Sequence, residues 1–152
     1  GASYGNRTQI IQYLENSGIM VQCFGNGWKM GRVCQEEMIR IFNSSKISLN
    51  FGASLTLTTN QVKARTFEIP ACGTFMLTSA SPNLENFFVI GKEIEVFYNN
   101  DDLINKINYF LTHNKEREQI AMAGYIRVHL EHTYSRRLAK IFSAIESRMS
   151  QT

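Results

Sequence analysis

The stretch Lys63-Ala64-Arg65-Thr66-Phe67-Glu68-Ile69-Pro70-Ala71-Cys72-Gly73 runs directly into the apolar segment Thr74-Phe75-Met76-Leu77-Thr78. The first segment predicts a short helix over residues 62–71, and the second predicts a buried strand. A helix that leads at once into a buried strand is half of the unit from which parallel α/β sheets are built. This stretch therefore predicts a sheet that is covered by helices.

The alternation of helices and strands continues on both sides of this stretch. Before it, the apolar spacing predicts helices over 7–16 and 35–42 and strands over 19–24 and 47–51. After it come a helical turn over 84–88, a strand over 93–98, and helices over 101–111, 115–131 and 134–149. The pattern predicts an α/β fold, a Rossmann-like parallel sheet with helices on both faces, in a single domain over 1–152 that ends in a helical segment over 101–149.

The composition is that of an ordinary globular chain. Its 152 residues fit one domain, and 43% of them are hydrophobic and 19% charged. No window is apolar for long enough to span a bilayer, and the start of the chain shows no signal-peptide pattern. The net charge of +3 comes from dispersed basic residues, which argues against a nucleic-acid partner.

The cysteines and histidines do not have the spacing of a metal site, so we expect no metal. The chain contains Cys23, Cys34 and Cys72, and His113, His129 and His132. We interpret all three cysteines as buried small hydrophobic residues in a protein of the reducing cytoplasm. We interpret His132 as a helix-capping or packing residue.

The opening stretch carries two cations and a carboxylate within six residues, Lys63, Arg65 and Glu68. Lys and Arg are the donors that bind phosphate oxygens, and a carboxylate accepts hydrogen bonds from sugar hydroxyls. The combination favours a site for a nucleoside diphosphate. The same residues also fit an amphipathic helix with a surface ion pair.

The predicted topology brings this stretch to the edge where ligands bind. In parallel sheets, ligands bind at the carboxyl ends of the strands. The Gly-rich turn at 25–27, the Ser/Thr-rich loop at 52–61 and the helix start at 62–66 all follow predicted strands, so we expect them to converge. No strand is predicted before the first helix, so either the first strand lies upstream of this sequence or the sheet is built differently.

Several motifs along the chain carry a resemblance to a known family. The segments are Tyr4-Gly5-Asn6-Arg7, Phe24-Gly25-Asn26-Gly27-Trp28, Gly31-Arg32-Val33, Ser45-Lys46-Ile47-Ser48-Leu49-Asn50-Phe51, Arg65-Thr66-Phe67-Glu68-Ile69-Pro70-Ala71-Cys72-Gly73, Gly91-Lys92-Glu93 and Glu131-His132-Thr133-Tyr134. Together they resemble the nucleotide-sugar half of the CgeB-like glycosyltransferases. That family is similar to the broader retaining glycosyltransferases of the GT-B fold, the glycosyl transferases group 1.

The resemblance implies two Rossmann-like domains that face each other across a cleft. The carboxyl-terminal domain would hold a nucleoside diphosphate sugar as donor substrate, without a further cofactor, and this chain matches only that domain. The amino-terminal domain, which would hold an unidentified acceptor, is missing from the sequence. The resemblance also places the first strand just upstream of Tyr4, so we expect a fragment of a two-domain enzyme.

The resemblance also implies roles for residues of the opening stretch. Glu68 matches the second carboxylate of a paired-glutamate motif and would bind the ribose hydroxyls. Arg65 and Lys63 would meet the diphosphate. Thr66 lies at the helix start, where free N–H groups and the helix dipole favour phosphate. The other carboxylate of the motif is replaced by Asn60, which can hydrogen-bond a sugar hydroxyl but cannot act as a base.

Four further residues complete the predicted site. Gly5 and Arg7 match the first loop, where Gly lets the backbone approach the donor and Arg can meet phosphate. The backbone of Val33 would contact the base. Trp28 either flanks the base pocket or belongs to the core. No catalytic residue is assigned.

The sequence thus predicts the donor-binding domain of a glycosyltransferase, with little activity on its own. The alternative is a non-catalytic α/β module that binds a nucleotide or a protein, and the Asn60 departure favours it. A response-regulator-like domain needs clustered acidic residues at its strand ends, which the predicted strands lack.

Overall fold

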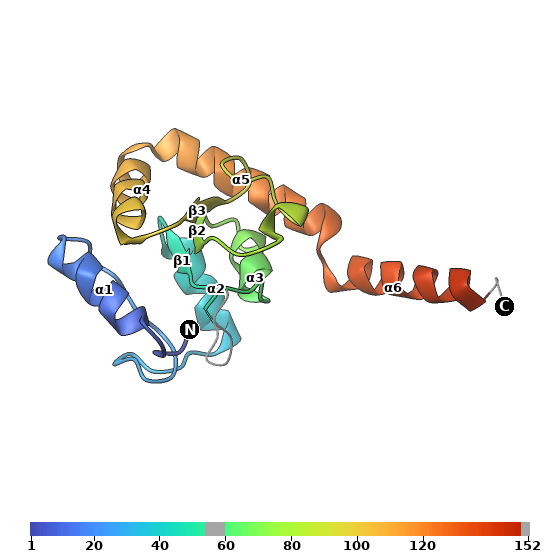
Figure 1. Ribbon diagram of the computed structural model, residues 1–152, viewed down its shortest axis with the longest axis horizontal. Coiled ribbons are helices and arrows are strands. Elements are labelled where there is room, and N and C mark those ends of the chain that lie inside the picture. The colour runs from blue at the N-terminus through green and yellow to red at the C-terminus, as the bar shows by residue number, and fades with distance from the viewer. Residues whose placement is uncertain (54–59, 150–152) are drawn as a thin grey trace.

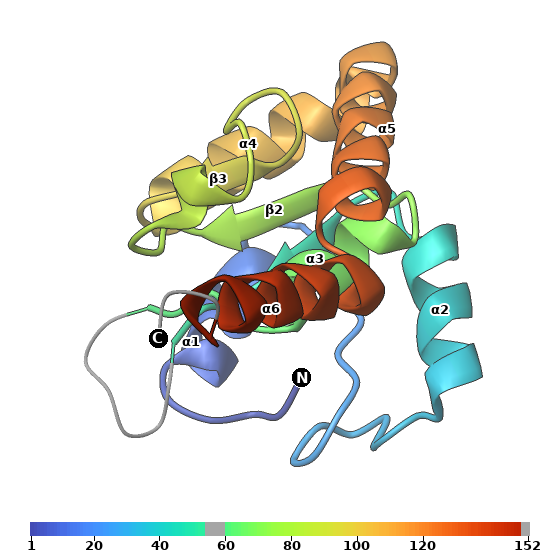
Figure 2. The same ribbon diagram turned by 90° about the vertical axis from the view of Figure 1, so that its right-hand side faces the viewer.

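The computed structural model describes residues 1–53 and 60–149 (Figure 1). The helices are α1 (Arg7–Asn16), α2 (Gln35–Ser44), α3 (Arg65–Ala71), α4 (Asn100–Thr112), α5 (Asn114–Glu131) and α6 (Tyr134–Met149), with a 3-10 turn at Leu84–Asn86. The strands are β1 (Ser48–Asn50), β2 (Met76–Ser79) and β3 (Glu95–Phe97). They pair in parallel in the order β1-β2-β3, side by side in Figure 2. The predicted α/β class is confirmed.

Successive strand residues point to opposite faces of the sheet, as the pleat requires. Leu77 belongs to one cluster of buried side chains and Met76 to a second. In β3, Phe97 lies in the first cluster and Val96 in the second. Both faces of the sheet are therefore covered, as is usual for a parallel sheet.

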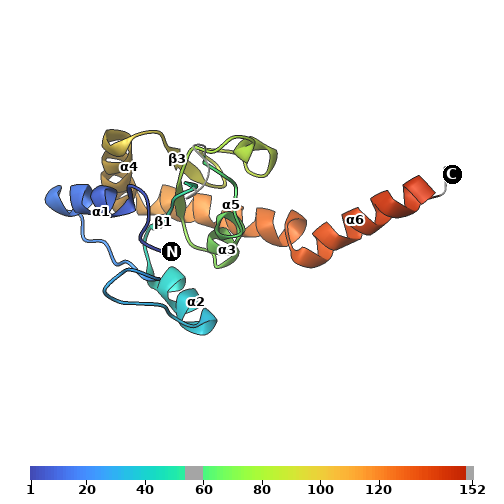
Figure 3. The same ribbon diagram turned by 60° about the horizontal axis from the view of Figure 1, so that its bottom comes forward.

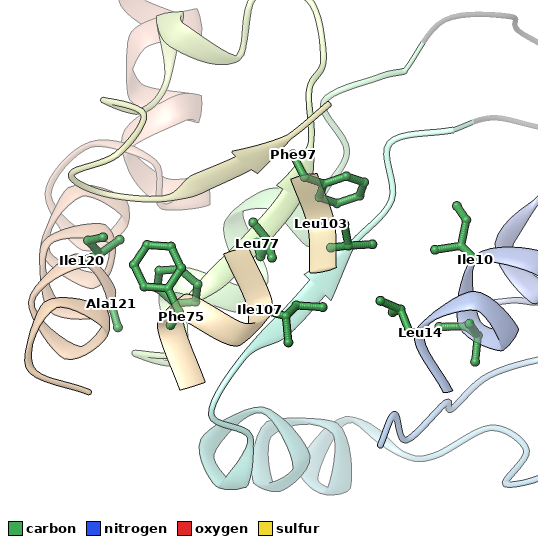
Figure 4. Close-up of a cluster of buried hydrophobic side chains, with 11 residues drawn as sticks. Ile10, Leu14, Phe75, Leu77, Phe97, Leu103, Ile107, Ile120 and Ala121 are labelled. Carbon is green, nitrogen blue, oxygen red and sulfur yellow. The ribbon is translucent and has the colours of Figure 1, made fainter. Parts of the chain in front are cut away.

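Helices α1 and α4 and the first turns of α5 cover one face (Figure 4). Leu14 and Leu103 are fully buried, and Ile107 packs beside them. In α4 these apolar residues recur at helical spacing, so one side of the helix faces the sheet. The side chain of Asn99 caps this helix by accepting from the N–H of Asp102 at 2.9 Å.

Helix α3 and the later turns of α5 cover the opposite face. Ile69 of α3 and Val128 of α5 pack on Met76 and Val96 of the sheet. Gly124 allows the close approach of α5, because a Cβ atom there would lie 2.3 Å from the carbonyl oxygen of Glu93. The helix that carries the opening stretch is thus held between the sheet and α5.

The strand predicted over 19–24 is wrong. Ile19, Val21 and Cys23 pack on the first cluster and alternate with exposed residues, as a strand would. However, the described part of the chain has only three strands, and none of them pairs with this segment. Period-two burial is satisfied here by packing against the core without a ladder of hydrogen bonds.

One of the predicted buried cysteines is also placed wrongly. Cys34 is exposed, because it precedes α2, a helix without buried residues. Cys23 and Cys72 are half-buried, and burial raises the pKa of both thiols. Those two agree with the interpretation as unreactive packing residues.

Helix α6 extends away from the rest of the chain in Figures 1 and 3. It has no buried residue, and Leu138, Ile141 and Phe142 are each about half exposed or more. Its first turn is tied to the body by Arg137, whose guanidinium lies 4.2 Å from the ring centre of Phe67 in α3. No helix among the described residues is long and apolar enough to cross a membrane.

Candidate functional site

The carboxyl end of β1 meets the start of α3 through a buried polar network. The side-chain amide of Asn50 donates to the hydroxyl oxygens of Thr66 (3.3 Å) and Thr78 (3.0 Å). All three residues are buried. The network joins β1, β2 and α3, so the predicted Thr66 lies at the helix start and also fixes that helix to the sheet.

A second polar cluster lies directly beyond β1 and centres on the hydroxyl of Tyr4. This hydroxyl accepts from Nη2 of Arg7 at 3.0 Å and from Nζ of Lys63 at 3.4 Å. It donates to the carbonyl oxygen of Ala53 at 3.0 Å, and Lys63 donates to the same oxygen at 2.6 Å. Two of the predicted phosphate-binding cations therefore share one partner.

Arg7 is held more tightly than a surface arginine. It is 8% exposed, its Nη1 donates to the carbonyl oxygen of Ala2 at 2.9 Å, and its Nη2 donates also to that of Phe51 at 3.0 Å. The guanidinium lies 4.0 Å from the ring centre of Tyr4, a cation–π contact. Its Nε has no partner among the described residues. Arg7 therefore contributes a fixed, largely buried charge.

No carboxylate in the described part of the chain neutralises these two cations. The ion pairs among residues 1–53 and 60–149 do not include Arg7 or Lys63. Residues 54–59 contain no Asp or Glu. Every partner of the two side chains in the described part of the chain is a neutral oxygen. The cluster therefore carries two positive charges that attract an anion.

Arg65 and Glu68 of α3 bind each other. Arg65 Nη1 lies 3.1 Å from Glu68 Oε2, and their side chains are 35% and 43% exposed, so a ligand can reach both. The Arg65 guanidinium also lies over the ring of Phe42 in α2, at 5.4 Å. This ion pair is the one that the amphipathic-helix interpretation predicts. The ribose and diphosphate roles of the two residues remain predictions.

Asn60 closes the base of the loop that follows β1. Its side-chain amide donates to the carbonyl oxygen of Ala80, just beyond β2, at 2.7 Å. Gly52 accepts from the backbone of Gln61 at 2.9 Å, and a Cβ at Gly52 would lie 2.6 Å from Oγ of Ser81. Asn60 thus lies at the predicted edge, and its sugar-binding role remains a prediction. Part of the predicted 52–61 loop lies outside the described residues.

The remaining predicted residues surround this edge less closely. Gly5 is exposed and has a φ of +62°. A Cβ atom built at this position would have no atom within 4 Å, so the backbone is open to an approaching ligand. The indole N–H of Trp28 donates to the carbonyl oxygen of Gly1 at 2.8 Å, and its ring packs on the first buried cluster. Val33 is half-buried just before α2. No described contact joins Trp28 or Val33 to Lys63.

Other candidate chemistry lies away from this edge. His132 is half-buried against the rings of Phe67, Phe87 and Phe88, and its Nε2 lies 3.0 Å from the carbonyl oxygen of Phe87. It is a packing residue, as predicted. The described residues contain no group of three or more side chains suited to hold a metal ion.

The sequence did not point to Tyr4, Asn50 or Thr78 as members of the site. Asn50 could have been found, because it lies near the carboxyl end of a predicted strand, which is the ligand edge of a parallel sheet. The role of Tyr4 depends on Lys63, which is distant in the sequence, and no local pattern indicates that contact.

Two solved structures are similar to this chain. Sucrose-phosphate synthase from Thermosynechococcus elongatus matches with a TM-score of 0.70 and 13% identity, over 100% of this chain and 38% of that one. The C-terminal domain of a glycosyl transferase group 1 family protein from Francisella tularensis matches with a TM-score of 0.60 and 13% identity, over 84% of this chain and 63% of that one.

At this identity the likeness shows the fold, which is that of the carboxyl-terminal domain of GT-B glycosyltransferases. This chain spans less than two thirds of either structure. No curated protein matches the sequence. The model of the family described as "Glycosyl transferase-like" matches residues 7–143. Fold and sequence agree, and the chain belongs to the glycosyl transferase-like family.

Proposed function

We propose that this chain is the donor-binding domain of a CgeB-like glycosyltransferase. It would hold a nucleoside diphosphate sugar, from which the sugar passes to an acceptor. The observation that supports this most strongly is the pair of cations, Lys63 and Arg7, that share the hydroxyl of Tyr4 and have no carboxylate partner in the described part of the chain. The diphosphate supplies the missing negative charge.

The same two cations would also assist the transfer. When the bond between sugar and diphosphate breaks, negative charge grows on the diphosphate that leaves. Cations fixed in advance stabilise that charge without a cost of reorganisation. Arg7 is buried and Lys63 is half-buried, so water screens them less than surface charges. At the start of α3, by contrast, the backbone N–H groups of Thr66 and Phe67 already donate to the carbonyl oxygens of Lys63 and Ala64, so the two cations would carry this role.

Glu68 would bind the ribose of the donor. A carboxylate accepts two hydroxyl hydrogen bonds, and the ion pair with Arg65 at 3.1 Å orients it. Asn60 would offer its side-chain oxygen to a sugar hydroxyl, since its amide nitrogen is already bonded to Ala80. Trp28 and Val33 would lie on the side of the base, and Gly5 would admit the donor at the first loop.

The acceptor would bind to a separate domain of the whole enzyme. The fact that this chain spans only 38% of the similar sucrose-phosphate synthase supports such a division. Three free cysteines favour a reducing compartment, the cytoplasm. The proposal assigns the charge of the diphosphate to Lys63 and Arg7 and includes no metal or further cofactor.

Calorimetric titration with UDP, GDP and ADP tests the proposal. We expect one of the three to bind the wild-type chain and Glu68→Ala to weaken it by about 1–3 kcal/mol, the range for a hydrogen-bonding group left unpaired. Arg65→Ala should weaken it as well, because Glu68 loses its partner. The matched control is Arg40→Ala, which breaks another i,i+3 ion pair, with Glu37 on α2, and whose side chain is 77% exposed.

The titrations distinguish a wrong proposal from a wrongly placed ribose site. If none of the three diphosphates binds, the proposal is wrong for this chain. If one binds and neither Glu68→Ala nor Arg65→Ala changes its affinity, the ribose site lies elsewhere. With the 2′-deoxy form of the same diphosphate, the loss caused by Glu68→Ala should shrink, because one of the hydroxyl partners is then absent.

A further inference from the structure

We propose that Tyr4 is a positioning residue that holds Lys63 and Arg7 together as a preformed diphosphate site. This inference rests on the proposed function and adds a residue to which no role has been given. Tyr4 joins three parts of the chain that are far apart in sequence: the first loop, the end of β1 and the approach to α3.

A tyrosine hydroxyl has one hydrogen to donate and accepts through its lone pairs. The hydrogen goes to the carbonyl oxygen of Ala53, and the lone pairs accept from Arg7 and Lys63. All of its capacity is therefore used within the protein. Tyr4 has no bond left for a ligand, so its effect on binding passes through the groups that it holds, among them the two cations.

The cluster fixes the ammonium group of Lys63 before a ligand arrives. A free lysine side chain loses roughly 1.5–2 kcal/mol of rotamer entropy when it is ordered. Here the carbonyl oxygen of Ala53 and the hydroxyl of Tyr4 already hold it, at 2.6 and 3.4 Å. Ordering that is already present in the free protein does not weaken binding.

The two cations have different parts in this arrangement. An ammonium has three donors, and two of those of Lys63 are used within the described residues, which leaves one for a phosphate oxygen. Both donors of Arg7 Nη2 are used, by Tyr4 and Phe51, and its Nε, which has no partner among the described residues, is buried out of reach in a residue that is 8% exposed. Lys63 therefore makes the contact, and Arg7 supplies charge behind it.

The test measures the affinity of the whole 152-residue chain for inorganic pyrophosphate, which requires no knowledge of the base. The variants are Tyr4→Phe, Lys63→Met and the double substitution. Tyr4→Phe keeps the ring over the Arg7 guanidinium and removes only the hydroxyl. The matched control is Tyr13→Phe, which removes another tyrosine hydroxyl, bonded to Asp101 at 2.7 Å and far along the chain from Lys63.

We expect Tyr4→Phe to weaken pyrophosphate about 10-fold, as for a lost hydrogen bond to a charged group. In the Lys63→Met background it should cause less than about a 3-fold further loss, because its main effect passes through Lys63. Tyr13→Phe should change nothing. A purely structural role would instead give the same factor in both backgrounds and would lower the unfolding temperature in parallel.

The results distinguish this inference from the proposed function. If the wild-type chain binds neither pyrophosphate nor a nucleoside diphosphate, both are wrong. If it binds pyrophosphate and Tyr4→Phe leaves the affinity unchanged, or the two substitutions act additively, only the role of Tyr4 is wrong. An unchanged affinity for the nucleoside without phosphate in Tyr4→Phe is the result expected if Tyr4 acts on the diphosphate alone.

Discussion

Asn50 joins α3 directly to the sheet. Its amide satisfies two buried hydroxyls, on Thr66 of the helix and Thr78 of the neighbouring strand. A buried polar group without a partner costs free energy. Removing one member of this network therefore leaves several buried groups unpaired and lowers the stability of the chain. The network thereby fixes the position of α3, the helix that carries Arg65 and Glu68, at the end of the sheet.

We predict that Asn50→Ala lowers the free energy of unfolding by about 1–3 kcal/mol, because the hydroxyls of Thr66 and Thr78 lose a partner in a buried place. Urea denaturation measures the change. The control is Asn108→Ala on an exposed position of α4, which should be neutral or slightly stabilising, since Ala is the better helix former. An Asn50→Ala chain as stable as the wild type would show that the network does not hold α3.

At the scale of elements, α5 approaches the backbone closely where it passes the turn before β3. The Gly124 position is buried, and a Cβ there would lie 2.3 Å from the backbone oxygen of Glu93 and 3.4 Å from the side chain of Pro70. The contact with Pro70 joins α5 to α3. A helical glycine ordinarily lowers stability relative to Ala, so the packing gain outweighs that preference here.

We therefore predict that Gly124→Ala destabilises the chain by about 1–3 kcal/mol through overpacking, although Ala favours an isolated helix by up to about 1 kcal/mol. Thermal unfolding of the variant measures this. The matched substitution is Met122→Ala on the exposed side of the same helix, which should change stability by less than about 0.5 kcal/mol. A stabilised Gly124→Ala chain would contradict the close packing of α5 on the turn.

The loss of an apolar side chain should lower the stability of the chain far more in α4 than in α6. Leu103 of α4 is fully buried in the first cluster, so Leu103→Ala should cost about 2–5 kcal/mol. Phe142 of α6 is 59% exposed, and Phe142→Ala should change the stability by less than about 0.5 kcal/mol. Urea titration of the two variants compares them. A large loss from Phe142→Ala would mean that α6 packs on the body in solution.

The sequence predicts those features of the structure that are determined by residues close together in the chain. The period of α4 and α5 lies within each helix, so their positions follow from the sequence within a residue or two of their observed ends. The segment 19–24 has the alternation of a strand, but a strand needs a partner, and pairing is not encoded within the segment. The cluster at Tyr4 was missed for the same reason, since it joins residues about fifty positions apart.

At the scale of the whole molecule, the covered sheet leaves one edge for binding. Buried clusters occupy both faces, so polar groups gather where β1 and β2 end and α3 begins. The cations Lys63 and Arg7, the pair of Arg65 with Glu68, and Asn60 lie around this edge. The fold of a glycosyltransferase domain and the positive charge at this edge together support a site for a nucleoside diphosphate.

The most direct test is a titration of the ¹⁵N-labelled chain with UDP, GDP and ADP, followed by its amide NMR signals. At least one diphosphate should shift the signals of Gly52, Ala53, Thr66 and Glu68 and leave those of Leu111 and Ile145 unchanged, because α4 and α6 end away from the site. Shifts confined to α5 or α6, or none with any of the three nucleotides, would contradict the account.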